Sequence, residues 1–469
     1  MIEDRYEGRL IESATIDEVR AVIPDYEIML VSILDAMLER YRRDPGYHFI
    51  DTKLSMLTGE DFPTPADDSH DYKGKTAIYG WIQGRGLEAL AGHIRWLPEC
   101  SVLDEAGKRQ RIEGLTAMMA EVFDQMEQVR AANGGRVWFV FDRTGRLFDL
   151  DDSGRRRYFG STAPATSSGD RFYSKGMLAA AALLGRPAKV REAMDYLQVV
   201  LADTVERRGG RDRFSFDPKN KVESVPGKLG HGGFMISLGA LALAAEVAPA
   251  EAWFRLSEQF IRYILDRHVN AGQSKGLQPY DFVECITAER KPWRESDGRV
   301  LSDPGHCLEF VGLAAKVLLL LRAWPHRSSN QRALLQHCAD VLPKVFGRNF
   351  ENGFACKVGG IIKAFDLVGR TPINSDMPWW SLPETMRAGA ELLLMSDGES
   401  RQRLLQAIAD CSNAFVRNFV NRKVHLMAYQ TVSAEGKPVD VIPATPDADP
   451  GYHTGLSIID FIRCIRAVA

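Results

Sequence analysis

Apolar residues recur at intervals of three and four along most of the chain, in about a dozen segments that polar turns separate. That spacing places them on one face of a helix. Because no shift in composition divides the chain, the pattern predicts one domain, spanning residues 1–469, with an all-α fold. Helices paired as six hairpins predict an (α/α)6 barrel, with segments at roughly 17–42, 85–96, 108–132, 174–184, 187–205, 232–247, 250–268, 306–323, 328–347, 381–395, 400–419 and 452–467.

Two interruptions of the helical pattern alternate apolar and polar residues as strands do. The segments 137–148 and 359–370 each contain Phe-Asp-x-x-Gly-Arg, a sequence typical of a turn between two strands. They predict small β-hairpins in the rim loops of the barrel. The segments 45–80 and 270–303 are rich in Pro, Gly, Asp and Ser, and they are predicted to be long loops over its mouth.

Composition and charge are those of an ordinary soluble protein, with 45% hydrophobic and 26% charged residues. A net charge of -3 gives no electrostatic reason to bind nucleic acid or an anionic membrane. The charged start lacks the apolar core of a signal peptide, and no uninterrupted apolar run approaches the roughly 20 residues that cross a bilayer. Seven scattered cysteines without a CxxC pair indicate reduced thiols, so a cytoplasmic protein without a zinc site is expected. The sequence also contains no Gly-rich loop of the dinucleotide-binding or phosphate-binding kind.

Two histidines follow Pro-Gly breaks at the starts of predicted helices. His306 follows the break at 304–305, and His453 follows the one at 450–451 with a single residue between. Since the inner helices of a ring of hairpins all begin at one mouth, both imidazoles are predicted to lie at the same end, on opposite sides of a cavity. Their pKa near neutrality suits removal of a proton from one face of a carbon and its return on the other. The alternative is a solvated first turn that Asp303 caps.

Other helix starts carry residues suited to binding a sugar. Arg85 can hold a hydroxyl or a developing oxyanion with its fixed fork of donors, or it can form a surface pair with Glu88. Adjacent tryptophans point in different directions, so one can pack in the core while the other faces a sugar ring. Glu309 lies one turn after His306 and can fix its tautomer or share its proton. The further candidates are Gln83, Tyr173 (with packing as its alternative), His231, Trp379, Trp380 and Glu384.

Four of these segments together resemble the N-acylglucosamine 2-epimerase superfamily, which includes cellobiose 2-epimerases and aldose–ketose isomerases acting on mannose and sulfoquinovose. Gln83-Gly84-Arg85 is similar to the family's QxR motif, and residues 304–309 are similar to its PGHxxE motif. Residues 379–384 resemble WWxxxE, and Tyr452-His453 resembles the family's Y/F-H pair. The motifs run in the family's order from about residue 80 to residue 455.

The resemblance implies a sugar 2-epimerase or aldose–ketose isomerase that transfers a proton at C2 through an enediolate, without a metal or another cofactor. It implies that His306 and His453 are the general acid and base, and that Glu309 and Glu384 orient or assist them. The partner implied is a small sugar, and the oligomeric state stays open, with a homodimer as one option. The substrate-binding residues implied or considered are Arg85 for the carbonyl-side oxygens, Trp380 for the sugar subsite, and Trp379, Tyr173, His231 and Gln83.

Two positions depart from the family's motifs. Leu456 stands where the last motif, HxxR, has arginine, and Ile236 stands where a segment like MHxxEA has histidine, with His231 five residues earlier. Two alternatives therefore stay open. One is a catalytically inactive, sugar-binding relative. The other is a glycoside or unsaturated-uronyl hydrolase on the same barrel, with Asp281, Glu284, Glu309 and Glu384 as candidate carboxylates.

Overall fold

The structure is a computed structural model that describes residues 5–63, 73–151, 153, 155–159, 166–206, 225–421, 428–439 and 447–468. Each predicted helical segment overlaps a helix, which confirms the all-α class. The α-helices of the described residues are α1 (Ile16–Ala21), α2 (Ile23–Arg43), α3 (Gly80–Trp96), α4 (Glu105–Ala132), α5 (Ser168–Leu183), α6 (Pro187–Val205), α7 (Gly232–Val247), α8 (Glu251–His268), α9 (Pro304–Ala323), α10 (Ser329–Gly353), α11 (Ser381–Leu393), α12 (Gly398–Asn418) and α13 (Ser457–Ala467).

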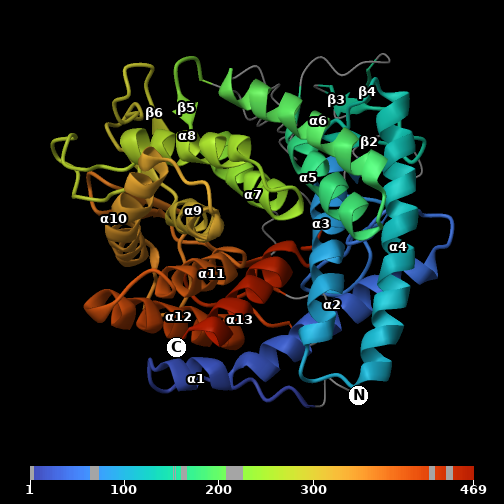
Figure 1. Ribbon diagram of the computed structural model, residues 1–469, viewed down its shortest axis with the longest axis horizontal. Coiled ribbons are helices and arrows are strands. Elements are labelled where there is room, and N and C mark those ends of the chain that lie inside the picture. Colours follow the sequence, from blue (N-terminus) through green and yellow to red (C-terminus); the bar gives the residue numbers. More distant parts are fainter. Residues whose placement is uncertain are drawn as a thin grey trace.

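Alternate helices form a closed inner ring (Figure 1). In order round this ring, α3 contacts α5, α5 contacts α7, α7 contacts α9, α9 contacts α11 and α11 contacts α13. A π-helical turn, Tyr452–Leu456, leads into α13 and contacts α3, which closes the ring. The predicted (α/α)6 barrel is therefore confirmed.

The outer ring consists of α4, α6, α8, α10 and α12, each packed against the inner helix that precedes it, and of α2. The Tyr26 ring of α2 lies edge-on to Phe461 of α13, with ring centroids 5.8 Å apart. The predicted segment 17–42 is divided at Val22, because Pro24 in the first turn of α2 lacks the N–H that a continuous helix would use. The inner helix that comes last in the sequence is thus paired with the long outer helix that comes first.

Short antiparallel ladders fix the starts of four inner helices. In each ladder, a strand directly before the inner helix pairs with a strand that follows the next outer helix. The pairs are β1 (Ile78–Tyr79) with β2 (Val140–Phe141), β5 (Leu229–Gly230) with β6 (Cys285–Ile286), β7 (Leu301–Ser302) with β8 (Ala364–Asp366), and β10 (Met377–Pro378) with β11 (Thr431–Val432). Two further pairs are β8 with β9 (Thr371–Asn374) and β3 (Phe148–Leu150) with β4 (Arg156–Tyr158).

Both predicted rim turns are present at their Phe-Asp-x-x-Gly-Arg sequences. Strands β8 and β9 form the second hairpin. At the first turn, β2 pairs mainly with β1, and a single bridge between Phe141 and Leu147 joins the two sides of the turn. In each turn the aspartate carboxylate accepts a backbone N–H two residues on: Asp142 accepts from Thr144 at 2.8 Å, and Asp366 accepts from Val368 at 3.0 Å. The repeated sequence therefore encodes the same side-chain-capped turn twice.

The predicted rim loops contain little regular structure. The described residues of 45–80 form loop until β1, with residues 64–72 lying outside the described ranges. The segment 270–303 is loop apart from β6 and β7.

Helix α9 is long and apolar enough, by length and composition alone, to cross a membrane, and no other helix of the described residues is. Most of its apolar stretch is buried inside the protein. Its place in the inner ring, between α7 and α11, accounts for this composition, because a helix buried on all sides is apolar on all sides.

Candidate active site

His306 and His453 both lie beside the Trp380 indole. His306 is in the first turn of α9, Trp380 directly precedes α11, and His453 is in the turn before α13. The His306 ring stacks on the indole with centroids 5.5 Å apart, and the His453 ring is 5.8 Å from it. Gly305 permits this approach, because a Cβ there would be 2.9 Å from the indole. The structure thus brings the two predicted imidazoles together at the starts of inner helices.

A carboxylate anchors His453 through one ring nitrogen. The His453 Nδ1 lies 2.8 Å from Glu384 Oε1, which also accepts a 2.8 Å hydrogen bond from the Ser457 hydroxyl. Arg387, one turn further along α11, forms an ion pair with the other oxygen of Glu384. Burial raises the pKa of Glu384, but Arg387, His453 and Ser457 outweigh it and lower this pKa to about 2. Because Glu384 is ionised, Nδ1 of His453 donates to it, and Nε2 is left available.

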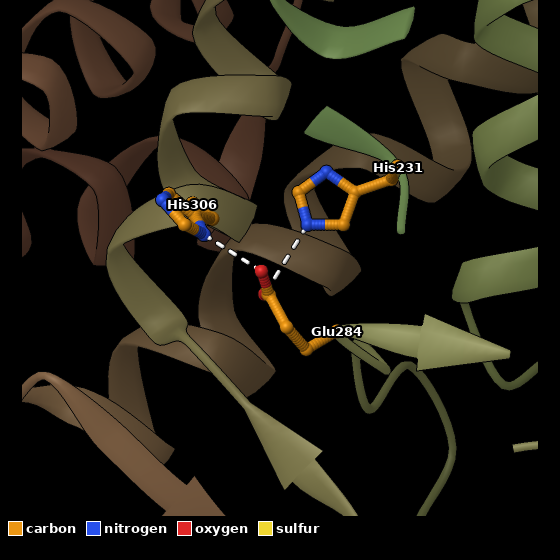
Figure 2. Close-up of side chains that lie close together, drawn as sticks. All are labelled: His231, Glu284 and His306. Carbon is orange, nitrogen blue, oxygen red and sulfur yellow. Dashed lines mark hydrogen bonds and ion pairs between the residues drawn. The ribbon is translucent and has the colours of Figure 1, made fainter. Parts of the chain in front are cut away.

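His306 has the same arrangement with a different carboxylate. Its Nδ1 lies 3.0 Å from Glu284 Oε1 and 3.4 Å from Asp303 Oδ2 (Figure 2). Asp303 also caps α9 by accepting the His306 backbone N–H at 3.3 Å, as predicted. Burial lowers the pKa of His306, but Asp303 and Glu284 outweigh it, so this pKa lies above its ordinary value. Both imidazoles are therefore anchored through Nδ1.

His231 shares the carboxylate of Glu284. It directly precedes α7, its side chain is buried, and its Nε2 lies 3.2 Å from Glu284 Oε2. The sequence pattern indicated His231 as a substrate-binding candidate and Glu284 only as a hydrolytic one. The two meet because the ladder of β5 and β6 pairs Gly230 with Cys285, the neighbours of these residues.

Arg85 lies in a cage of aromatic rings. Its guanidinium carbon is 4.6 Å from the centroid of Trp81, 4.3 Å from that of Phe172 and 5.0 Å from that of Tyr452. Helices α3 and α5 approach closely here, since a Cβ on Gly84 would be 2.5 Å from the Phe172 backbone. The Arg85 Nε has no hydrogen-bond partner among the described residues. Cation–π contacts with these rings hold the guanidinium in place.

Lys175 is a buried cation beside this cage that the sequence pattern did not indicate. Its Nζ donates to the Tyr452 hydroxyl at 2.7 Å and pairs with Glu88 at 2.9 Å. The structure does not favour the alternative considered for Arg85, a surface pair with Glu88, because Glu88 pairs with Lys175. Gly239 of α7 leaves room for the ammonium, as a Cβ there would be 3.2 Å from Nζ.

Other predicted candidates make contacts within the protein. Gln83 bonds the Ile50 backbone twice: its Oε1 accepts from the N–H at 2.8 Å, and its Nε2 donates to the carbonyl at 3.0 Å. Tyr173 is fully buried and donates to Glu127 of the outer helix α4 at 2.9 Å. The structure therefore gives Gln83 and Tyr173 contacts within the protein, which for Tyr173 is the packing considered as its alternative, and substrate binding by either residue stays a prediction. Trp379 lies edge-on to His453, with ring centroids 6.3 Å apart.

The carboxylates considered for hydrolysis are mostly engaged. Asp281 is buried and is held by Arg370 at 2.8 Å and by the amide of Asn352 at 3.1 Å. Glu284 and Glu384 hold imidazoles, as described above. Glu309 lies beside Glu384 and His453, with ligand atoms of the three within 4.8 Å of one another.

Among the residues that the structure describes, two groups of side chains could hold a divalent cation. They are His231, Glu284 and His306, and Glu309, Glu384 and His453, each with three ligand atoms within 4.8 Å of one another. Imidazole and carboxylate are ligands that Zn²⁺ accepts. In both groups, one ring nitrogen of each histidine already lies within hydrogen-bonding distance of a carboxylate of the same group.

Helix α3 positions the turn that carries His453. The His93 Nε2 lies 3.0 Å from the Gly451 carbonyl, and Gly451 has a positive φ of 74°. Burial lowers the pKa of His93 to about 4, so its ring is neutral and Nε2–H donates. Leu456, which stands where the family has arginine, packs against Gly92 of α3.

The closed ring of helix pairs is also the fold of solved sugar epimerases and of a mannose isomerase. Cellobiose 2-epimerase from Spirochaeta thermophila DSM 6192 superposes with a TM-score of 0.62 and 12% identity, covering 97% of this chain and 98% of that one. A sugar epimerase from a ruminal bacterium gives a TM-score of 0.60 and 13% identity, covering 92% and 100%. D-mannose isomerase gives 0.59 and 14%, covering 92% and 97%. At these identities the likeness establishes the fold. A scan against protein-family models and a search of curated protein sequences give no match.

Proposed function

We propose that the protein is a carbohydrate epimerase or aldose–ketose isomerase that moves a proton at C2 of an aldose. One observation carries the proposal. The rings of His306 and His453 lie 5.5 and 5.8 Å from the Trp380 ring centroid, and each is anchored through Nδ1 to a carboxylate, so both Nε2 atoms are left for a substrate. Two imidazoles held in this way are suited to take a proton from one side of a carbon and to supply one on the other.

The proposed chemistry starts from the open-chain sugar. The C1 carbonyl acidifies the C2 hydrogen, and one imidazole removes it through Nε2 to leave an enediolate. Arg85 and the imidazolium stabilise the negative charge that develops on the oxygens. Return of a proton to the opposite face of C2 gives the epimer, whereas delivery to C1 gives the ketose.

The other two interpretations have less support. Hydrolysis requires a carboxylic acid and a second carboxylate that are free to act on the glycosidic bond. Here Asp281, Glu284 and Glu384 are each engaged by protein groups. An inactive relative has no need of two carboxylate-anchored imidazoles. The epimerases and the isomerase with the same fold are in keeping with proton transfer.

The proposal is tested by incubating the protein with aldoses in deuterated water. Mannose, glucose, N-acetylglucosamine and cellobiose form a suitable panel, and products are read by NMR. We expect deuterium at C2 of an epimer or at C1 of a ketose. His306→Gln and His453→Gln should each lower the rate by roughly 100- to 10,000-fold.

His337→Gln serves as the matched control, because His337 is exposed on the outer helix α10. It should keep the parent rate. Turnover without label in the product, or full activity in both active-site variants, would contradict the proposal. Release of reducing ends from oligosaccharides would favour the hydrolase interpretation instead.

A further inference from the structure

Glu284 accepts hydrogen bonds from two histidines, and it lies outside all four motifs of the resemblance. Its Oε1 is 3.0 Å from His306 Nδ1, and its Oε2 is 3.2 Å from His231 Nε2. Figure 2 shows the carboxylate between the two rings, with the three side chains coming from separate segments. Burial raises the pKa of Glu284, but the two imidazoles outweigh it and hold this pKa well below its ordinary range. An ionised carboxylate only accepts, so both ring nitrogens donate to it.

Backbone hydrogen bonds hold Glu284 between the starts of α7 and α9, where these histidines lie. The pairing of Gly230 with Cys285 places Glu284 beside His231. The Glu284 N–H donates at 2.9 Å to the carbonyl of Leu301, in the strand that runs directly into α9. The carboxylate is thus positioned by the main chain, and its place does not depend on a bound sugar.

The other groups around His306 leave Glu284 as its main anchor. Asp303 lies 3.4 Å from His306 Nδ1, but it also caps α9 and pairs with Lys363 at 2.6 Å. Lys363 lies 5.7 Å from the Trp380 ring centroid, and Trp380 covers one face of the imidazole. His231 faces His306 at 5.7 Å between ring centroids, with the Glu284 carboxylate bonded to both. The His453 ring also lies beside the indole, 5.8 Å from its centroid.

We propose that Glu284 is a positioning residue that holds His306 in the tautomer with its proton on Nδ1, so that Nε2 meets the sugar, and that His231 holds the carboxylate in place. In the proton-transfer step, the C2 hydrogen goes to Nε2 while Nδ1–H stays bonded to Glu284. The catalytic meaning of this arrangement rests on the proposed function. The tautomer does not, because it is a property of the protein without substrate.

The tautomer is measured by NMR of the full chain with 15N-labelled histidine, at a pH where His306 is neutral. The His306 signals are those that disappear in His306→Gln. We expect the parent to show Nδ1–H, and Glu284→Ala to show a mixture of the two tautomers. Glu295→Ala is the matched control, because Glu295 lies in the same loop but binds Lys228 at 2.6 Å. Unchanged Nδ1–H in Glu284→Ala, with the fold intact by circular dichroism, would overturn the proposal.

Kinetics give a second readout that loss of packing alone would not produce. Glu284→Gln keeps the shape but removes the charge, and we expect kcat to fall by roughly 10- to 100-fold with little change in KM. Removing a negative neighbour lowers the pKa of His306, so the acidic limb of the pH–rate profile should move to lower pH. If kcat falls but the acidic limb of the pH–rate profile does not shift, the proposed role of Glu284 is overturned. If no sugar is turned over, the proposed function fails while the NMR result still decides the tautomer.

Discussion

Gly455 lies directly against the imidazole of His93, and a Cβ at position 455 would overlap His93 Nε2. Gly455→Ala should therefore push the turn that carries His453 away from α3. We expect a loss of roughly 1–3 kcal/mol in the free energy of unfolding, as for other overpacked core positions. Activity should fall as well, because His453 would leave its place beside Trp380. Urea unfolding and the deuterium-incorporation assay measure the two effects.

The matched control for this change is Gly347→Ala in the outer helix α10. No atom lies within 4 Å of a Cβ built at Gly347, so the alanine meets open space. In a helix interior this change should be neutral or stabilise by up to roughly 1 kcal/mol. Parent-like stability and activity in Gly455→Ala would show that the contact with His93 is not required.

His93 should make stability depend on pH between about 6.5 and 4. Its pKa is lowered from an ordinary 6.5 to about 4 in the folded protein, so in this range the unfolded chain binds more protons. Stability should therefore be fully present above pH 6.5 and decline as the pH falls toward 4. The difference between these two pKa values corresponds to roughly 3 kcal/mol in the free energy of unfolding.

Urea unfolding at neutral pH and at about pH 4.5 separates this contribution from the general effect of acid. His93→Gln retains a donor for the Gly451 carbonyl but does not titrate. It should lose less stability on acidification than the parent does. Equal losses in both proteins would remove His93 as the source of the dependence.

Lys175 and Glu88 should be strongly coupled. Lys175→Met leaves Glu88 without its cation at a largely buried position, and we expect a loss of roughly 3–5 kcal/mol. The double variant with Glu88→Gln removes both charges and should recover most of that loss. Lys344→Met is the control, because Lys344 and Asp340 form an exposed pair that contributes little. If the losses of the two single variants simply add in the double variant, the pair is not coupled.

Arg85→Ala should lower kcat by roughly 100- to 1,000-fold, the effect of removing one donor to a developing oxyanion. Arg85→Lys should restore only part of it, because lysine lacks the planar fork of donors. Arg95→Ala, at an exposed position of the same helix, should retain the parent rate. The deuterium-incorporation assay provides the comparison, and equal rates for Arg85→Ala and Arg95→Ala would exclude a role in stabilising the enediolate.

Added Zn²⁺ should inhibit the reaction, and EDTA should leave it unchanged. Both candidate metal groups include an imidazole proposed to carry the proton, so a bound cation would occupy it. His231→Gln should weaken inhibition through the first group, and Glu309→Gln should weaken it through the second. Loss of activity with EDTA that Zn²⁺ restores would instead assign the site to metal chemistry.

Helices and helix starts could be predicted from the sequence because they depend on local signals. The apolar period located the barrel, and the Pro-Gly breaks located His306 and His453 at helix starts. Asp303 was predicted as a cap from its position alone, and the structure confirms it. These predictions required no knowledge of which distant residues would lie nearby.

Partners that come together through tertiary structure could not be predicted. Glu284 meets His231 and His306 through two-residue strands, which are too short to show an alternating pattern. From the sequence, Lys175 would be expected on the surface, because buried lysines are rare. The space for its buried ammonium group depends on Gly239, two helices further along the sequence. The contact of Gln83 with Ile50 was missed for the same reason, because Ile50 lies on another element; for Tyr173 packing was considered, but its partner Glu127 was not.

The pairing of α2 with α13 bears on how the molecule is made. During synthesis the apolar face of α2 must wait for α13, which emerges more than four hundred residues later. Contacts of such long range are slow to form and leave surface open to aggregation. The turn that carries His453 is synthesised directly before α13, so a nascent chain would lack this imidazole until the last inner helix is in place.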